Sequence, residues 1–298
     1  MDLTVNGAAG HKSNNLLIVF LEVVMNMFAP AEVAKNYIAT GKAKVSAPIW
    51  KMILLGVLAG AFIAVGGVAS TTASVSISAA SVGKLVGACV FPGGLAMVLL
   101  AGSELFTGNC LLTIPLLQKE ISLGGMLKNW VFVYIGNLIG GCLVGAAVVF
   151  GHQLSLFGNG MAVSVMSTAA AKCTMPFGDA VIKGIMCNFL VCIAVWISFA
   201  AKDVAGKIVG IFFPIMMFVL CGFEHSVANM YYISAGLFAK AVPAYADAAA
   251  AAGVNTSAIS WGAFFGSNLL PVTIGNIIGG GICVGAVYWA LYLRKKNK

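Results

Sequence analysis

Two stretches of the sequence decide the fold: Gly102-Ser-Glu-Leu-Phe-Thr-Gly-Asn109 and Gly222-Phe-Glu-His-Ser-Val-Ala-Asn229. They share glycine, glutamate, a small residue and asparagine in the same register. Each lies near the middle of an apolar run, 85–117 or 208–239, that is more than 30 residues long. An unbroken helix of that length would extend ~50 Å, whereas the core of a bilayer is about 30 Å thick. We therefore predict two discontinuous helices, each with irregular backbone at membrane depth.

A tilted, continuous helix that extends out of the bilayer is the alternative for each long run. It would leave Glu104 and Glu224 facing lipid, where a charged side chain is costly. Irregular backbone, in contrast, is tolerated at that depth where it lines a cavity or is buried in protein. The interrupted form is therefore favoured.

The composition requires a membrane environment. Of the 298 residues, 60% are apolar and 9% are charged, whereas a soluble domain carries about 25% charged residues. This excludes a disordered chain, a collagen-like chain and a conventional cytosolic enzyme. The net charge of +8 sets orientation in a membrane, and we expect no nucleic-acid partner.

A second pair of matching motifs indicates an internal duplication. Ile135-Gly-Asn-Leu-Ile-Gly-Gly141 corresponds to Ile274-Gly-Asn-Ile-Ile-Gly-Gly280, in the same order relative to the first pair. A unit with three crossings has an odd number, so its second copy must enter the membrane upside down. Four further apolar runs each have the length of one crossing: 49–69, 126–150, 180–200 and 264–293.

The predicted fold is therefore an all-α integral membrane protein with six transmembrane helices in two inverted three-helix repeats, of which helices 2 and 5 are broken. Paired glycines at four-residue spacing, such as Gly136 and Gly140, allow close helix packing within it. The chain divides into an N-terminal segment, 1–48; a six-span membrane domain, 49–293, with repeats 49–150 and 180–293; and a basic tail, 294–298.

Basic residues gather on one side of the predicted membrane domain. Only four of the 17 Lys and Arg residues lie outside the termini and the connections 118–128 and 201–207, which leaves 13 on that side. Both termini are therefore predicted to be cytoplasmic, in the cell membrane. The run 16–28 is too short to cross and contains Glu22, so we expect an interfacial helix there.

His225 is the only histidine inside a predicted span. An unperturbed imidazole exchanges a proton near physiological pH, and an ionisable residue inside the membrane suggests function. Glu224 could accept from one ring nitrogen and so determine which nitrogen faces the interior. The alternative is a histidine satisfied by packing. Glu104 is expected to accept backbone N–H groups and brace its own loop.

Broken helices expose backbone N–H groups and positive dipole ends at midplane, a setting that suits a small anion. Thr107, Asn188 and Asn276 could add side-chain donors or acceptors. Lys172, in a polar connection on the external side, could concentrate anions at the entrance, or it could simply be solvated. No catalytic or metal-binding motif occurs in the sequence, so we expect no enzyme activity, no cofactor and no metal. The eight cysteines are interpreted as packing residues.

The segments Gly102–Thr107, Gly222–Asn229 and Asn268–Gly279 closely resemble signature segments of the formate/nitrite transporter family. The resemblance extends over about 29–294. It implies an aquaporin-like six-span fold, a homopentamer in a lipid bilayer, and passage of formate, nitrite or hydrosulfide.

The resemblance also implies residue roles. His225 is the central histidine, Thr107 the broken-helix threonine, and Lys172 a vestibule lysine. Asn188 and Asn276 match pore-facing asparagines, while Glu104, Glu224, Asn109 and Asn229 are expected to give structural support. The constrictions fall on Phe91, Leu95 and Phe106 on the cytoplasmic side, and on Phe218 and Val191 on the periplasmic side.

The predicted function is a channel or transporter for small monovalent anions, most of all formate, with protonation at His225. Nitrite and hydrosulfide are the alternative substrates. Two other hypotheses remain open: a plain anion channel in which His225 only donates a hydrogen bond, and a membrane-embedded enzyme or ligand sensor that translocates nothing.

Overall fold

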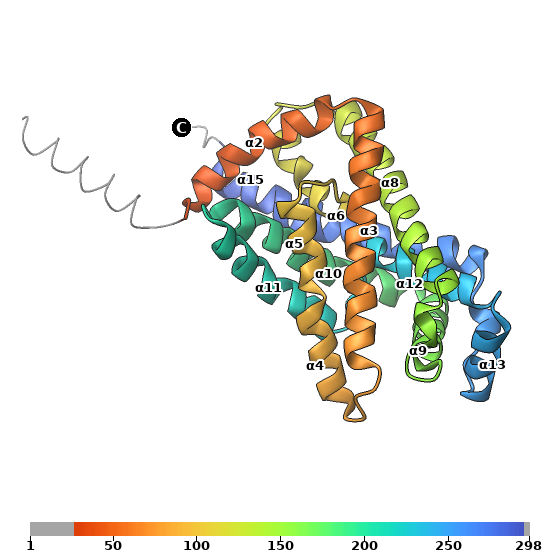
Figure 1. Ribbon diagram of the computed structural model, residues 1–298. Coiled ribbons are helices and arrows are strands. Elements are labelled where there is room, and N and C mark those ends of the chain that lie inside the picture. The colour runs from red at the N-terminus through yellow and green to blue at the C-terminus, as the bar shows by residue number, and fades with distance from the viewer. Residues whose placement is uncertain (1–26, 295–298) are drawn as a thin grey trace, which may run out of the picture.

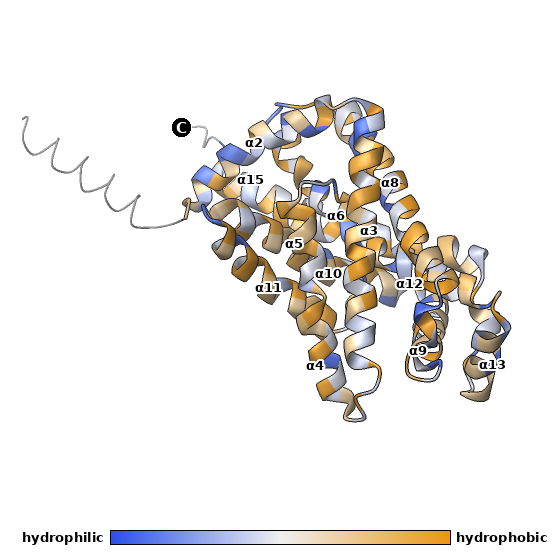
Figure 2. Cartoon of the chain, in the orientation of Figure 1, coloured by the Kyte–Doolittle hydropathy of each residue, from blue (hydrophilic) through white to orange (hydrophobic). Residues whose placement is uncertain are grey.

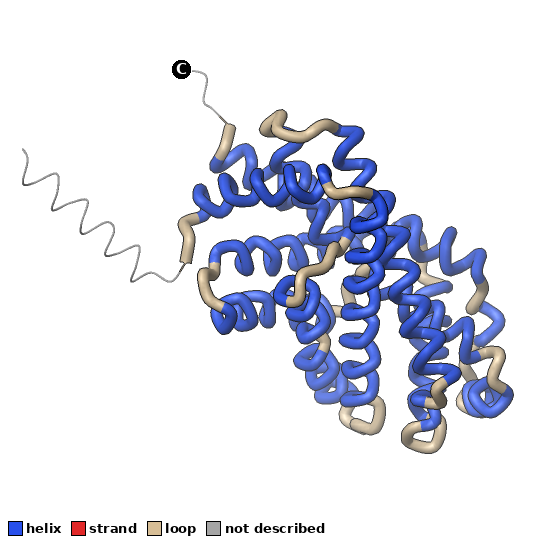
Figure 3. The backbone as a smooth tube through the Cα atoms, turned by 45° about the horizontal axis from the view of Figure 1, so that its top comes forward, coloured by secondary structure: helices blue, strands red, loops and turns tan. Residues whose placement is uncertain are grey.

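The computed structural model describes residues 27–294, and within that range helices make up nearly all the secondary structure (Figure 3). The predicted all-helical class is confirmed. An isolated bridge joins Met27 to Ala201. The interfacial helix predicted over 16–28 lies almost entirely outside the described residues.

The uninterrupted crossings follow the predicted apolar runs. They are α3 (Ile49–Ser74), α8 (Leu123–Phe150) and α10 (Phe177–Ala200). The last crossing contains two π-helical stretches, and its parts are η4 (Ala263–Leu269), α14 (Leu270–Ile277), η5 (Ile278–Ala286) and α15 (Val287–Tyr292). The described residues contain five helices long and apolar enough to cross a membrane, counting Ala80–Leu100 as one.

Both long runs are interrupted where the sequence predicts. In the first, α4 (Ala80–Val90) and α5 (Pro92–Leu100) are separated by a loop from α6 (Phe106–Asn109), which continues through η1 (Cys110–Leu112) into α7 (Thr113–Leu117). In the second, α11 (Val204–Leu220) is separated from α12 (Ser226–Ala239). Gly102 and Gly222 open the two loops with φ of 79° and 70°, a conformation that glycine adopts without strain.

Several shorter helices were not predicted. They are α2 (Pro30–Ser46), α9 (Gly160–Cys173) and α13 (Pro243–Ala251), with the short turns η2 (Gln153–Ser155) and η3 (Thr256–Ala258). Lys172, which was predicted to lie in a polar connection, lies in the last turn of α9, a helix within the connection between α8 and α10. Figure 1 shows α2 crossing the end of the molecule where α3 begins, and α9 and α13 near the end where α3 finishes.

Glycines bring the crossings into backbone contact. A Cβ on Gly136 of α8 would collide with Ile53 O of α3, and one on Gly275 of α14 would collide with Val181 O of α10. Small residues allow such close approach where lipid provides no hydrophobic force between helices.

The outer faces of the long helices are apolar, whereas polar residues gather on α2 and at helix ends (Figure 2). Trp50 and Leu54 of α3 are 65% and 57% exposed. A contiguous apolar exterior of this kind is stable in lipid rather than in water, in agreement with a membrane protein.

Candidate functional site

A buried asparagine holds each interruption in place. Asn137 of α8 donates through Nδ2 to Gly56 O at 2.8 Å and to Glu104 O at 2.9 Å, and its Oδ1 accepts from Phe106 N–H at 2.9 Å. These bonds satisfy backbone groups that the broken helix would otherwise leave unpaired inside the membrane. Asn137 was not among the predicted site residues, although the repeated Ile-Gly-Asn motif contains it.

Asn276 of α14 makes the same three bonds in the second half. Its Nδ2 donates to Gly184 O at 2.8 Å and Glu224 O at 3.0 Å, and its Oδ1 accepts from Ser226 N–H at 2.9 Å. The side chain is completely buried and contributes to the lining of neither cavity described below. Its hydrogen-bonding atoms are used by backbone, so the structure gives it a bracing position.

A lysine and a glutamate meet beside the first interruption. Lys44 of α2 donates through Nζ to Glu104 Oε1 at 2.8 Å and to Asn109 Oδ1 at 2.9 Å. Asn109 Nδ2 donates in turn to Glu104 Oε2 at 2.6 Å and to Asn129 Oδ1 at 2.8 Å. The prediction that Glu104 accepts backbone N–H groups was wrong, since its carboxylate is held by side chains.

An equivalent pair lies beside the second interruption. Lys172 of α9 donates to both carboxylate oxygens of Glu224, at 2.8 and 2.9 Å. Asn229 Nδ2 donates to Glu224 Oε2 and to Asn268 Oδ1, each at 2.7 Å. In each half the glutamate therefore accepts from a lysine and from an asparagine side chain. Lys172 is an ion-paired residue on a helix rather than a cation in an open loop.

Thr107 and His225 meet at the centre of the molecule. The Oγ1 of Thr107 and the Nε2 of His225 are 2.9 Å apart. The other ring nitrogen, Nδ1, accepts the Ala228 N–H at 3.0 Å and so caps α12. Because Nδ1 is an acceptor, the neutral ring carries its proton on Nε2 and donates it to Thr107. The idea that Glu224 orients the imidazole was wrong, since a backbone amide does so.

Apolar rings press against this histidine. The Phe218 ring stacks on His225 with centroids 5.8 Å apart, and Phe91 meets Phe218 edge to face at 5.6 Å. Phe91 was predicted to lie in one constriction with Leu95 and Phe106, but it contacts Phe218 of the other constriction, so that grouping was wrong. Leu95 and Val191 are buried in the same apolar cluster.

Two other predicted residues lie to the side of these rings. Phe106 packs edge to face on Trp130 and Tyr134 of α8, with centroids 5.9 and 4.9 Å apart, and it lines neither cavity. Asn188 of α10 donates through Nδ2 to Thr107 O at 3.1 Å and to Asn276 O at 2.7 Å. Asn188 therefore holds the backbone carbonyl of Thr107 in place.

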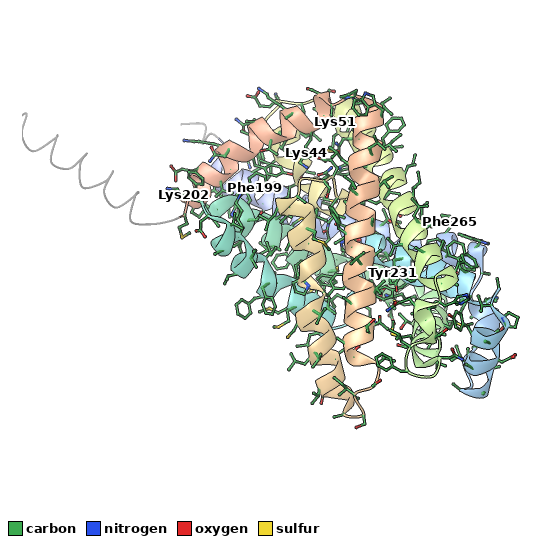
Figure 4. The ribbon with its side chains drawn as sticks, viewed as in Figure 1. Lys44, Lys51, Phe199, Lys202, Tyr231 and Phe265 are labelled. Atoms are coloured by element: carbon green, nitrogen blue, oxygen red, sulfur yellow. The ribbon has the colours of Figure 1, made fainter. Side chains whose placement is uncertain are left out.

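A cavity approaches the centre from each end. The smaller, about 350 Å³, is lined by residues of α2, α3, α5 and α10, including Lys44, Leu95 and Glu104. Figure 4 shows Lys44 and Lys51, which both line it, at the end of the molecule near α2. The larger, about 930 Å³, is lined by Phe91, Lys172, Phe218 and His225 among others. Leu95 thus faces one cavity and the Phe91–Phe218 pair the other, which makes the buried layer between them a septum.

Comparison with known proteins assigns this architecture. The model of the formate/nitrite transporter family matches residues 31–290. This chain belongs to the formate/nitrite transporter family. It is therefore an integral membrane transport protein and not an enzyme, as predicted.

Individual members of the formate/nitrite transporter family match over most of their length. A probable formate transporter of Methanothermobacter thermautotrophicus is 39% identical over 285 residues, covering 90% of this chain and 98% of the relative. The formate channel FocA of Escherichia coli K12 is 36% identical over 276 residues, covering 91% and 97%. A solved pentameric formate channel with formate bound superposes with a TM-score of 0.73 at 32% identity, covering 83% of this chain and 98% of that one.

Proposed function

We propose that this chain forms a homopentamer in the cell membrane and carries formate across it, the anion taking up a proton at His225. The observation that carries the proposal is the septum, where Thr107 and His225 share a hydrogen bond beside the Phe91 and Phe218 rings, between two cavities. The formate channels among its relatives support the choice of substrate.

Desolvation argues for passage in the neutral form. An ionised carboxylate would lose several kcal/mol of solvation among the septum rings, whereas the neutral acid would lose far less. His225 lines the larger cavity, so solvent there can supply the proton. A proton added at Nδ1 breaks the hydrogen bond that this nitrogen accepts from the Ala228 N–H. This loss destabilises the charged ring, which therefore readily passes a proton to an anion next to Thr107.

The orientation is part of the same proposal. With both termini in the cytoplasm, the cavity beside α2 is the cytoplasmic vestibule and the cavity beside α9 is the external one. The excess of basic residues near α2 and the 118–128 and 201–207 connections supports this arrangement.

The direct test is formate uptake into proteoliposomes as a function of pH. The variant His225→Gln keeps an amide donor for Thr107 but cannot titrate, while His225→Phe loses both properties. We expect the parent's flux to rise as pH falls and both variants to lose that rise. His152→Gln, which alters an exposed histidine, is the control and should retain it. An unchanged pH profile in His225→Gln would exclude protonation at this residue.

Passage of the anion itself is the second candidate. The neutral ring with its proton on Nε2 supports it, because that N–H can donate to an anion without giving up the proton. In that case His225→Gln keeps both flux and pH profile, and formate carries a steady current. Nitrite and hydrosulfide, the alternative substrates, are tested by competition with labelled formate in the same vesicles.

A further inference from the structure

Tyr37 of α2 carries a buried hydroxyl group that has no hydrogen-bond partner. Its side chain is 1% exposed. An unsatisfied buried hydroxyl costs about 1–3 kcal/mol, and phenylalanine would fill the same volume without that cost. The Tyr37 hydroxyl is therefore available to donate to a ligand that reaches it.

Tyr37 lies at the smaller of the two cavities, called the inner cavity below. Tyr37 is part of the lining of the 350 Å³ cavity, and its ring packs edge to face on Phe199, another lining residue, with centroids 5.1 Å apart. Burial raises the pKa of the Tyr37 phenol, and the Cys192 thiol and the Glu104 carboxylate raise this pKa further. The group thus remains an O–H donor at any physiological pH.

Further polar groups converge on the same cavity. Tyr37, Thr40 and Lys44 all line it from one face of α2, as their spacing of three and seven residues requires. Lys51, at the start of α3, adds a second ammonium group. The charged residues of the lining are Lys44, Lys51 and Glu104, so its formal net charge is +1. This charge suits a single monovalent anion.

The cavity leads to the central pair. Gly108, the residue after Thr107, is part of the lining. Cys192, which is buried in the same apolar cluster as Tyr37, donates through Sγ to Thr107 O at 3.4 Å. An anion held at Tyr37 is therefore positioned on the approach to Thr107 and His225.

We propose that the inner cavity contains a docking site for a small monovalent carboxylate, in which the Tyr37 hydroxyl donates to a carboxylate oxygen and Lys51 supplies the balancing charge. This inference rests on the proposed function, because the ligand is the transported formate. The site holds the anion outside the septum, before it reaches the proton donor.

The test compares Tyr37→Phe with Tyr231→Phe. Tyr231 is a matched control, because its hydroxyl is likewise buried and without a partner but lines neither cavity. Figure 4 shows it well away from Lys44 and Lys51. Each variant removes only an unsatisfied hydroxyl, so both should fold and unfold at or above the temperature of the parent. Formate uptake into proteoliposomes gives the half-saturating concentration of each.

Loss of a hydrogen bond to a charged group should raise the half-saturating formate concentration of Tyr37→Phe by roughly tenfold. Tyr231→Phe should keep the parent value. Formate should also raise the unfolding temperature of the purified parent and of Tyr231→Phe more than that of Tyr37→Phe, whereas chloride should not distinguish them.

Equal half-saturation in Tyr37→Phe and the parent, or an equal rise in both variants, would overturn the docking site while leaving formate transport intact. A parent protein that takes up no formate would instead overturn the proposed function, and the docking site with it.

Discussion

The residues that follow Glu104 in the first interruption are Leu105-Phe-Thr107. The residues at the corresponding positions after Glu224 in the second interruption are His225-Ser-Val227. The surroundings of the two segments correspond closely. Both sides share a lysine–glutamate pair and an asparagine that donates to the glutamate and to a second asparagine. They differ in that Lys44 also donates to Asn109 Oδ1, whereas Asn229 Oδ1 has no partner.

The main difference between the halves is therefore at the centre. The lysine–glutamate–asparagine clusters beside the two interruptions are constrained, because the polar groups of irregular backbone inside a membrane must find hydrogen-bond partners in both halves. The residues that meet in the middle carry no such constraint, and one half provides the imidazole while the other provides the hydroxyl. A single Thr107–His225 pair follows, where strict repetition would have given two histidines or none.

The largest effect on stability is expected from removing the lysine of one lysine–glutamate pair. Lys172→Met leaves Glu224, whose side chain is 5% exposed, without its cation, and removing one partner of a buried pair costs about 3–5 kcal/mol. Lys44→Met should cost less, because the Glu104 side chain is 14% exposed. Thermal unfolding of the purified assemblies measures both. Equal losses, or a greater loss for Lys44→Met, would show that burial does not determine the difference.

A smaller effect is expected at the helix contacts. A Cβ on Gly279 would collide with Ile185 O and one on Gly140 with Val57 O, so each Gly→Ala change should destabilise by about 1–3 kcal/mol through overpacking. Gly93→Ala is the control, because nothing lies within 4 Å of the added Cβ. If the control lost as much stability as the two contact variants, close packing would not be the cause.

The loop glycines should behave alike. Gly102 and Gly222 both have positive φ, and a Cβ on either would meet nothing within 4 Å. Backbone strain alone should therefore cost about 1–2 kcal/mol for Gly102→Ala and for Gly222→Ala. Unfolding temperatures that drop by the same amount would support equivalent loops. A loss in one variant only would mean that the halves differ in their loops as well as at the centre.

The smallest effect on stability is expected at the central pair. Thr107→Val removes one hydrogen bond to His225, worth about 0.5–1.5 kcal/mol. Formate uptake should nevertheless fall by up to about tenfold, since the hydroxyl orients the ring at the septum. The equivalent residue of the other half, Val227, provides the control Val227→Thr, which should leave uptake unchanged. Parental uptake in Thr107→Val would remove the hydroxyl from the transport path.

Both interruptions could be predicted from the sequence, because the runs around Glu104 and Glu224 are longer than one crossing requires and carry a carboxylate near the middle. Helix α9 was not predicted, because its 14 residues are too few to cross the membrane, although its buried residues, such as Met161, Val165 and Ala169, recur at helical spacing. The ion pair between Lys172 and Glu224 joins residues 52 apart, and the Thr107–His225 bond joins residues 118 apart. Local patterns do not encode such pairings, so Lys172 was predicted without its partner and Glu224 with the wrong one.

We propose that formate crosses the septum as the neutral acid after taking a proton at His225. Formate flux and electrical current recorded together in one preparation of planar bilayers or proteoliposomes test it most directly. Passage of the neutral acid should give a formate flux that acidifies the receiving compartment and carries no net charge. A steady current that grows with the formate gradient and accounts for the whole flux would contradict it.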